Sequence, residues 1–251
     1  MRLRFLGTGT SMGVPVIGCS CPVCTSDDPR NRRLRTSALV QVDDQTILID
    51  AGPDFREQAL RVGLRGVDAV LLTHAHFDHT AGLDDLRPLC YRGGVPVYGS
   101  GRTLADVRER FAYAFRNDSA GSTRPNLELH QVTSPFQIGS TTIQPFDVLH
   151  GTWTITGYRI GRLGYVTDAS HIPPSAFALL SDLDVLVLNA LRFEPHPTHY
   201  TVGEALEVVA ALRPRQAYFV HMTHTIDHQR ASQALPPGVA FAYDGLEVVI
   251  E

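Results

Sequence analysis

Lysine is absent from this chain of 251 residues, so all 22 of its basic side chains are arginine. This absence excludes a lysine Schiff base and a lysine general base. The chain carries 26 acidic residues and a formal net charge of −4, which argues against general electrostatic binding to nucleic acid. We therefore expect no nucleic-acid partner, although a local basic patch is compatible with this balance.

Long apolar runs are also absent. No stretch reaches the roughly 18 consecutive apolar residues that a transmembrane helix needs, so we expect no membrane partner. The opening MRLRFLGTGT lacks the apolar segment of a secretion signal and indicates a short strand followed by a glycine turn. These features predict a cytoplasmic protein.

Cysteine is scarce, with four residues, but Cys19, Cys21 and Cys24 lie together in GCSCPVC. This spacing favours metal binding in a reducing compartment over a disulfide framework. A structural zinc ion takes four ligands in a tetrahedron. Either this motif is no metal site, or a fourth ligand comes from far along the chain.

Patterns typical of strands and helices are mixed along the chain. Apolar and β-branched runs predict strands at Arg2–Gly7, Ser37–Val42, Thr46–Asp50, Asp68–Thr73, Val95–Tyr98, Thr141–Phe146, Thr154–Ile160, Gly164–Thr167, Asp184–Leu188, Gln216–His221 and Glu247–Ile250. Helices are expected at Asp54–Val62, Gly101–Ala114 and Val202–Leu212, and a loop at 115–126. This mixture predicts the α/β class with mixed sheets, and no boundary divides the single domain that we expect over residues 1–251.

Residues 71–82, LLTHAHFDHTAG, are the stretch most indicative of chemistry. An apolar run leads into them, so they follow the carboxyl end of a strand. Residues two apart in extended chain face the same way, so His74 and His76 can hold one ion together. Asp78 and His79 lie where the chain should turn into a helix and can face a second ion. Imidazole and carboxylate groups suit borderline transition metals.

This His74-x-His76-x-Asp78-His79 pattern resembles the signature of the metallo-β-lactamase fold superfamily. GTGTSMGVP (7–15) resembles the family's opening, and ILIDAGPD (47–54) resembles its second motif, where an Asp–Gly-type turn supports the site. The resemblance covers nearly the whole chain. It implies a four-layer αβ/βα sandwich with two mixed sheets.

The resemblance also implies a two-metal centre. Further ligands should follow in the order His, Asp, His, and the candidates at the ends of apolar runs are His150, Asp168 and His221. One divalent metal, Zn²⁺ or Mn²⁺, would be held by His74, His76 and His150. The other would be held by Asp78, His79 and His221, with Asp168 bridging both. Two such metals share a hydroxide that serves as the nucleophile.

The cysteine cluster is similar to that of the phosphodiesterases of the bacterial phosphonate-degradation (carbon–phosphorus lyase) pathway. Those enzymes hydrolyse cyclic ribose phosphate diesters and carry an extra structural zinc. His224, in HMTHTIDH, matches the position of the fourth zinc ligand, and Cys90 and His228 are its rivals. Proteins of the coenzyme PQQ biosynthesis B type show a similar cluster.

Two further features bear on the substrate. His199, in EPHPTHYTVGEAL, matches the family's catalytic histidine outside the metal shell, which would protonate the leaving alkoxide or bind phosphoryl oxygens. A histidine that caps a helix or faces solvent is the alternative. Guanidinium groups suit bidentate phosphate contacts, so we expect substrate binding by Arg32, Arg33 and Arg35. A solvated basic loop is the alternative there.

The resemblance implies a two-metal hydrolase with Asp78 and His199 as catalytic residues. Its expected substrate is a small phosphodiester, a cyclic sugar or nucleotide phosphate such as 5-phosphoribosyl 1,2-cyclic phosphate. The alternatives are a tRNA 3′-processing type of nuclease, which needs a protruding arm, and a member of the PQQ B type. Relatives form dimers, so a homodimer is also expected.

Overall fold

Two seven-stranded sheets form the centre of the computed structural model, which describes residues 1–116 and 123–251. In spatial order, the first sheet contains β14 (Glu247–Val249), β1 (Arg2–Gly7), β2 (Ser37–Val42), β3 (Gln45–Ile49), β4 (Ala69–Leu71), β5 (Val95–Gly99) and β6 (Leu127–Gln131). The second contains β13 (Val239–Phe241), β12 (Gln216–Val220), β11 (Val185–Asn189), β10 (Leu163–Tyr165), β9 (Trp153–Ile160), β8 (Thr141–His150) and β7 (Phe136–Ile138).

Both sheets are mixed. In the first, β14, β1, β2 and β3 pair antiparallel, whereas β3 to β6 pair parallel. In the second, β7 to β10 pair antiparallel, whereas β10 to β13 pair parallel. The fold is therefore the α/β arrangement with two mixed sheets that the sequence predicts.

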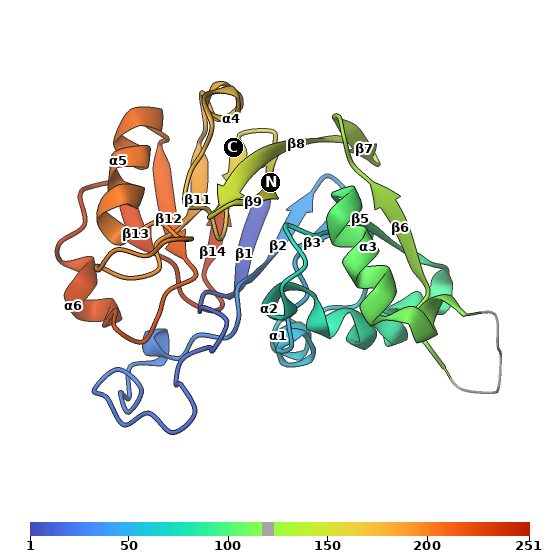
Figure 1. The fold of residues 1–251 in the computed structure, drawn as a ribbon, viewed down its shortest axis with the longest axis horizontal. Coiled ribbons are helices and arrows are strands. Elements are labelled where there is room, and N and C mark those ends of the chain that lie inside the picture. Colours follow the sequence, from blue (N-terminus) through green and yellow to red (C-terminus); the bar gives the residue numbers. More distant parts are fainter. Residues whose placement is uncertain (117–122) are drawn as a thin grey trace.

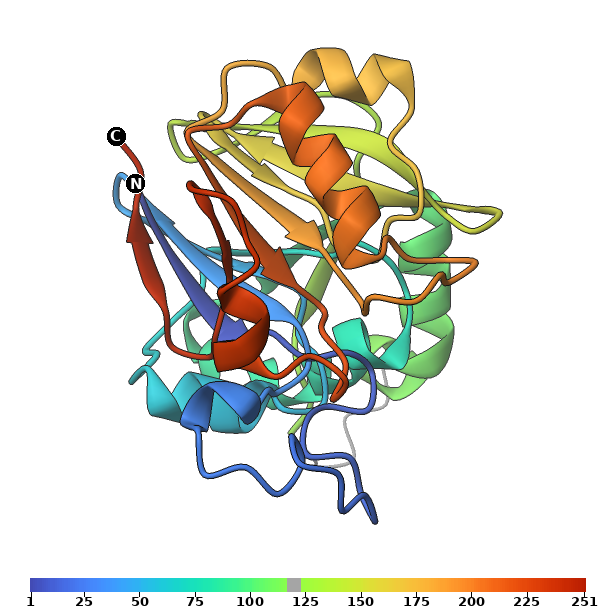
Figure 2. The same cartoon turned by 90° about the vertical axis from the view of Figure 1, so that its left-hand side faces the viewer.

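Helices cover the outer faces of the two sheets (Figure 1). On the first sheet lie α1 (Phe55–Arg61), α2 (Phe77–Thr80), the 3₁₀ helix η2 (Ala81–Arg92) and α3 (Gly101–Arg110). On the second lie α4 (Pro174–Leu179), α5 (Val202–Leu212) and α6 (His228–Ser232), and Figure 2 shows α5 lying over its strands. Short 3₁₀ turns η1 (Pro29–Asn31) and η3 (Ala112–Phe115) lie in the connections.

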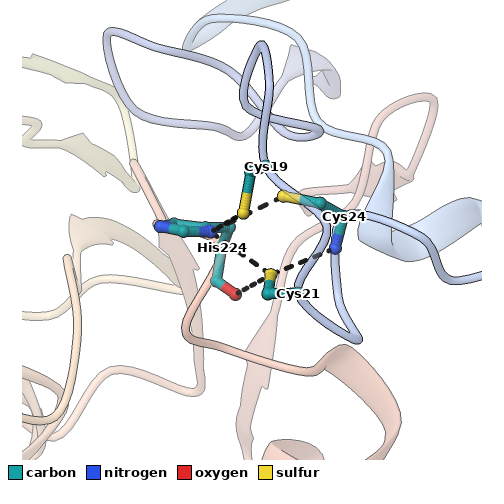
Figure 3. A group of neighbouring side chains, drawn as sticks. All are labelled: Cys19, Cys21, Cys24 and His224. Atoms are coloured by element: carbon teal, nitrogen blue, oxygen red, sulfur yellow. Dashed lines mark hydrogen bonds between the residues drawn. The ribbon is translucent and has the colours of Figure 1, made fainter.

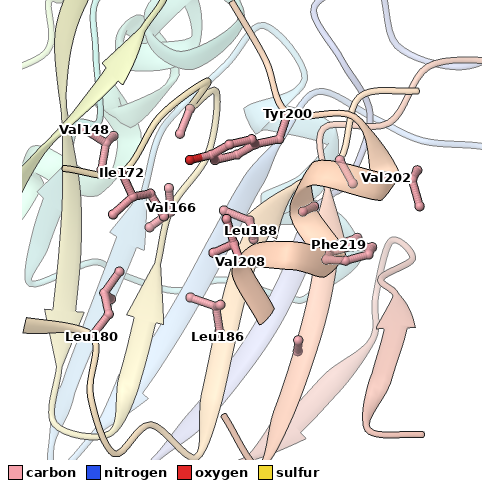
Figure 4. Packing of buried hydrophobic residues seen from close by; sticks show 14 of the residues in the cluster. Val148, Val166, Ile172, Leu180, Leu186, Leu188, Tyr200, Val202, Val208 and Phe219 are labelled. Atoms are coloured by element: carbon pink, nitrogen blue, oxygen red, sulfur yellow. The ribbon is translucent and has the colours of Figure 1, made fainter. Parts of the chain in front are cut away.

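Three apolar layers hold the sandwich together. One lies between the sheets and includes Phe5, Ile47 and Tyr165. The other two lie between each sheet and its helices, with Phe55 in the first and Phe219 in the second (Figure 4). Three buried layers separate four layers of elements, which confirms the predicted αβ/βα sandwich.

The predicted elements differ from the structure mainly in their ends. The strand predicted at Thr141–Phe146 continues to His150 as β8, and α3 ends at Arg110 before η3. The short strands β6, β7 and β13 were not predicted, since each has only 3 to 5 residues and weak alternation. Most of the loop predicted at 115–126, namely 117–122, lies outside the described residues.

Three strand ends turn sharply through left-handed backbone. Asp50, Asp168 and His221 have φ values of 60°, 60° and 59°. Each follows a buried strand or run, and the turn directs its side chain to the same edge of the sandwich. Within the described residues, no helix is long and apolar enough to cross a membrane.

Candidate active site and metal centres

Three histidines form one potential metal-binding group at the edge where the sheets meet. Their members are His74, His76 and His150. His74 Nε2 lies 2.9 Å from His76 Nδ1, and the His150 ring is 5.2 Å from that of His76. His74 and His76 come from the loop after β4, and His150 ends β8 in the other sheet. The group is therefore assembled only when the two sheets pack together.

A second group contains two histidines and two carboxylates. Its members are Asp78, His79, Asp168 and His221. His79 Nε2 lies 3.2 Å from Asp78 Oδ2 and 3.4 Å from Asp168 Oδ2. His221 Nε2 lies 3.0 Å from Asp168 Oδ1. Asp168 thus has one carboxylate oxygen near each histidine.

The other ring nitrogen of several of these histidines is held by a neighbour. Nδ1 of His79 lies 2.7 Å from Asp50 Oδ2, and Nδ1 of His150 lies 2.9 Å from the carbonyl oxygen of Thr198. Such partners orient an imidazole so that its free nitrogen can bind a metal. The motif containing Asp50 is part of the sequence prediction, but the contact with Thr198 joins segments that no local pattern connects.

A buried nitrogen without a hydrogen bond tests whether metals fit here. His79 Nε2 is fully buried, has no hydrogen-bond partner among the described residues and points at two carboxylates. An imidazole nitrogen and a carboxylate oxygen on one tetrahedral Zn²⁺ lie about 3.4 Å apart. The observed distances of 3.2 and 3.4 Å agree, so these side chains fit a shared cation.

The charges of the second group are strongly coupled. Burial raises the pKa of Asp168, but His221 and His79 outweigh it and hold that pKa well below its usual value. Burial lowers the pKa of His79, but the carboxylates of Asp78, Asp168 and Asp50 outweigh it and raise that pKa well above its usual value. The carboxylates therefore remain negative and favour positive charge at this position.

His199 lies between the two groups. Its Nε2 is 3.1 Å from Asp168 Oδ1, and its ring stacks on that of His221 with centroids 5.1 Å apart. Its Nδ1 contacts Thr198 Oγ1 at 2.9 Å, and its side chain is 12% exposed. The imidazole can thus exchange a proton with a molecule bound at the site.

The cysteine cluster meets His224 on the segment that follows β12 (Figure 3). The Sγ atoms of Cys19, Cys21 and Cys24 lie 3.3, 3.3 and 3.5 Å from His224 Nδ1. A thiolate and an imidazole on one tetrahedral Zn²⁺ lie about 3.6 Å apart, so the four side chains fit that ion. The backbone N–H of Cys24 lowers the pKa of Cys21 to about 6, which favours the thiolate.

The two rivals of His224 lie elsewhere. The Cys90 thiol donates to carbonyl oxygens of Leu86 and Asn126. His228 is buried and packs on Phe241 and Tyr243 at ring distances of 6.4 and 5.9 Å. Neither belongs to the cysteine group, so the geometry leaves His224 as the fourth candidate ligand.

Arg33 requires a correction as a predicted substrate-binding residue. Its side chain is 1% exposed, and its guanidinium donates to the carbonyl oxygens of Thr223 and Ile226. It therefore supports the segment around His224 and cannot reach a substrate in solvent. A buried arginine is rare unless it is paired, which is why the basic run indicated exposure.

The other two arginines of the run remain predictions as substrate ligands. Arg32 is exposed. Arg35 is half-buried, and its guanidinium pairs with the carboxylate of Asp54 at 3.0 Å. Its backbone N–H donates to the same carboxylate.

Comparison with protein families places the chain in a known group. Residues 45–222 match the model of the beta-lactamase superfamily domain. An octanoyltransferase of Porphyromonas gingivalis is 41% identical over the whole chain, but the match covers 52% of that relative, about half its length. A coenzyme PQQ synthesis protein B of Methylobacterium radiotolerans is 32% identical, with 90% of each chain covered.

Solved structures show the same fold over the whole chain. A diphosphatase of the PhnP family has a TM-score of 0.94 and 41% identity, with 100% of this chain and 98% of that chain covered. Zn²⁺-bound PqqB from Methylobacterium extorquens has a TM-score of 0.82 at 22% identity, with both chains fully covered. The short form of human tRNase Z has a TM-score of 0.73 at 17% identity, again with full coverage. These last two likenesses concern the fold alone.

Proposed function

The chain belongs to the β-lactamase superfamily, and we propose that this metal-dependent hydrolase cleaves a small phosphodiester. The observation that carries the proposal is His199, which stands between two metal-binding groups with its Nε2 3.1 Å from Asp168. Hydrolysis of a phosphodiester needs a nucleophile on one side of phosphorus and a proton for the leaving oxygen on the other. The site contains groups suited to both tasks.

Seven side chains would hold two divalent metals, Zn²⁺ or Mn²⁺. The first metal would be held by His74, His76 and His150, and the second by Asp78, His79 and His221, with Asp168 between them. Bound there, the metals would activate water and take up negative charge from the phosphoryl oxygens. Asp78 and Asp168 remain ionised, because nearby histidines lower both pKa values against the effect of burial.

His199 would act on the leaving group. Its Nδ1 is held by Thr198, so Nε2 can carry the proton toward the site. Asp168 Oδ1 lies within hydrogen-bond distance of that nitrogen and helps to hold the ring in place. An alkoxide leaves poorly without such a proton, whereas a stabilised phenolate leaves without it.

The substrate that we propose is a cyclic sugar or nucleotide phosphate such as 5-phosphoribosyl 1,2-cyclic phosphate. Support comes from the full-length match to a PhnP-family diphosphatase and from the combination of that site with the Cys19–His224 cluster. The PhnP-family neighbour is described as a diphosphatase, so phosphoanhydrides are the first alternative substrates to test. The octanoyltransferase relative is matched over only about half of its length. We therefore do not propose acyl transfer as an activity of this chain.

We also propose one structural Zn²⁺ on Cys19, Cys21, Cys24 and His224. A cytoplasmic location would suit it, because reducing conditions keep such thiols free. The homodimer also remains a prediction, and a sedimentation measurement of the molecular mass in solution would test it.

Hydrolysis of bis(p-nitrophenyl) phosphate, 5-phosphoribosyl 1,2-cyclic phosphate, a nucleoside diphosphate sugar and an octanoyl thioester would test the proposal. We expect the two phosphodiesters to be cleaved best, with activity lost in Asp78→Ala and kept in the exposed control Asp147→Ala. Preference for the thioester, or full activity after metal chelation, would refute it. Binding of precursor tRNA would instead favour the nuclease alternative.

A further inference from the structure

Asn189 ends β11 as a polar residue on an apolar face. Side chains two apart along a strand share a face, and Val185 and Val187 of this strand pack in the apolar layer between the sheets. Asn189 continues that face and is 0% exposed. A buried amide costs free energy unless its hydrogen bonds are made, so its partners indicate what the residue does.

Both ends of the Asn189 amide bind one residue, Ala169. The backbone N–H of Ala169 donates to Asn189 Oδ1 at 2.7 Å, and Asn189 Nδ2 donates to the carbonyl oxygen of Ala169 at 2.9 Å. Two residues of antiparallel strands exchange a pair of backbone hydrogen bonds in the same way. The side chain of Asn189 therefore takes the place of a neighbouring strand for Ala169.

This contact begins where the ladder between β10 and β11 stops. The last residue pair of that ladder is Tyr165 and Val187, and Asp168 then turns away with a left-handed φ of 60°. A non-glycine residue in that conformation persists only where the surrounding structure holds it. Ala169 directly follows the turn, so its two hydrogen bonds to Asn189 help to hold Asp168 in this conformation.

The carbonyl oxygen of Ala169 also fixes the segment that carries His199. It accepts a second hydrogen bond, from the backbone N–H of Tyr200 at 2.8 Å. One carbonyl group, held by Asn189, therefore lies one residue from both Asp168 and His199. The side chains of these two residues meet, with 3.1 Å between Asp168 Oδ1 and His199 Nε2. A shift of Ala169 would thus move both side chains relative to the histidines that come from the first sheet.

We infer that Asn189 is a positioning residue, whose side-chain amide holds Asp168 between the two metal-binding groups and His199 beside it. The inference rests on the proposed function for the bridging role of Asp168 and for the proton transfer by His199. Asn189 is not among the candidate ligands and acts through Ala169. Its loss should therefore change the geometry of the site while every candidate ligand and the proton donor remain.

The coupling between two bound metals provides the first readout. Two Mn²⁺ ions joined by a carboxylate give an exchange-coupled electron paramagnetic resonance signal, which separate ions do not give. We expect this signal from the Mn²⁺-loaded wild type. Asn189→Leu loses both hydrogen bonds, so two ions should still bind but with weaker coupling. Asn189→Asp, which keeps the acceptor for the N–H of Ala169 and loses only the donor, should also weaken it and tests the same point if Asn189→Leu does not fold.

Asn31→Leu is the matched control. Asn31 is also a buried asparagine, 1% exposed, and its amide binds the carboxylate of Asp227 and the backbone N–H of His228. This variant should lower the unfolding temperature, as Asn189→Leu should, but leave the Mn²⁺ coupling unchanged. The positioning role would be overturned by equal coupling in the wild type and both Asn189 variants, by an equal change in Asn31→Leu, or by uncoupled ions in the wild type.

Steady-state kinetics provide the second readout. A misplacement of about 1 Å can cost on the order of 100-fold in rate, so both Asn189 variants should lower kcat for 5-phosphoribosyl 1,2-cyclic phosphate about 10- to 100-fold. KM should change much less, because the candidate metal ligands remain. An unchanged kcat, with or without a rise in KM, would contradict the inference. If the wild type shows coupling that the variants lose but cleaves no phosphodiester, the positioning of Asp168 stands and the proposed function fails.

Discussion

His79 Nδ1 lies 2.7 Å from Asp50 Oδ2, and both side chains are fully buried. Asp50 also accepts hydrogen bonds from the backbone N–H and the hydroxyl of Thr73, at 2.8 Å each. The carboxylate therefore connects the end of β3 to the loop that carries the metal-binding motif. Its position fixes the direction in which His79 Nε2 points.

Asp50→Asn should weaken metal binding or activity about 10- to 100-fold, because the amide supports the imidazole less well than a carboxylate does. Metal titration and kcat/KM would measure the effect. Asp43→Asn is the matched control: Asp43 is an exposed aspartate whose φ of 50° is also left-handed. Unchanged metal affinity in Asp50→Asn would show that the contact serves folding alone.

His199→Gln should lower kcat about 10²- to 10⁴-fold for a sugar phosphodiester, the usual range for a lost general acid. For bis(p-nitrophenyl) phosphate, whose phenolate leaves unaided, the loss should be much smaller. Metal content should stay constant in His199→Gln and in the control His196→Gln. Equal losses for both substrates, together with a loss of metal, would instead make His199 a ligand.

The resemblance to the metallo-β-lactamase fold supplies the order of the candidate ligands, and the sequence places a fitting residue at the end of each buried run. With that order, His74, Asp168 and His221 are predictable as neighbours, and the structure brings them to one edge. Arg33 is different, because its burial depends on carbonyl groups some 190 residues away. The pairing of Asn189 with Ala169, 20 residues away, is also unpredictable from any local pattern.

Cys21→Ser should lower zinc by about one ion per chain while the active-site metals remain. The unfolding temperature should also fall, because the cluster joins the N-terminal loop to the segment after β12. Elemental analysis and calorimetry would measure the two effects. Cys90→Ser, which removes a thiol outside the cluster, should change neither zinc content nor the number of active-site metals. Zinc content unaffected by Cys21→Ser would exclude the site.

His228 should make folding stability depend on pH. Burial lowers its pKa from 6.5 to about 4, and Arg30 and Arg33 add to the effect. Between these values the unfolded chain binds a proton that the folded chain does not, so stability falls as pH decreases from 6.5 to 4. Each pKa unit corresponds to about 1.4 kcal/mol, and partial solvent screening leaves an expected loss of about 1–2 kcal/mol.

Urea unfolding at pH 5 and pH 7 would test this linkage. His228→Gln should remove that part of the pH dependence, whereas the control His130→Gln, at an exposed position on β6, should keep it. The difference between wild type and variant cancels other groups that titrate in the same range. Identical slopes for wild type and His228→Gln would refute the assignment.

The left-handed turns at Asp50, Asp168 and His221 have a consequence for protein engineering. A non-glycine residue in this conformation costs about 1 kcal/mol or more, and three such residues converge on one site. Glycine would relieve that strain while removing the functional side chain. At Asp50 the loss of the buried hydrogen bonds to Thr73 and His79 would oppose that gain, whereas any gain at Asp168 or His221 would come at the expense of the site. A library screened for stability must therefore also be screened for turnover.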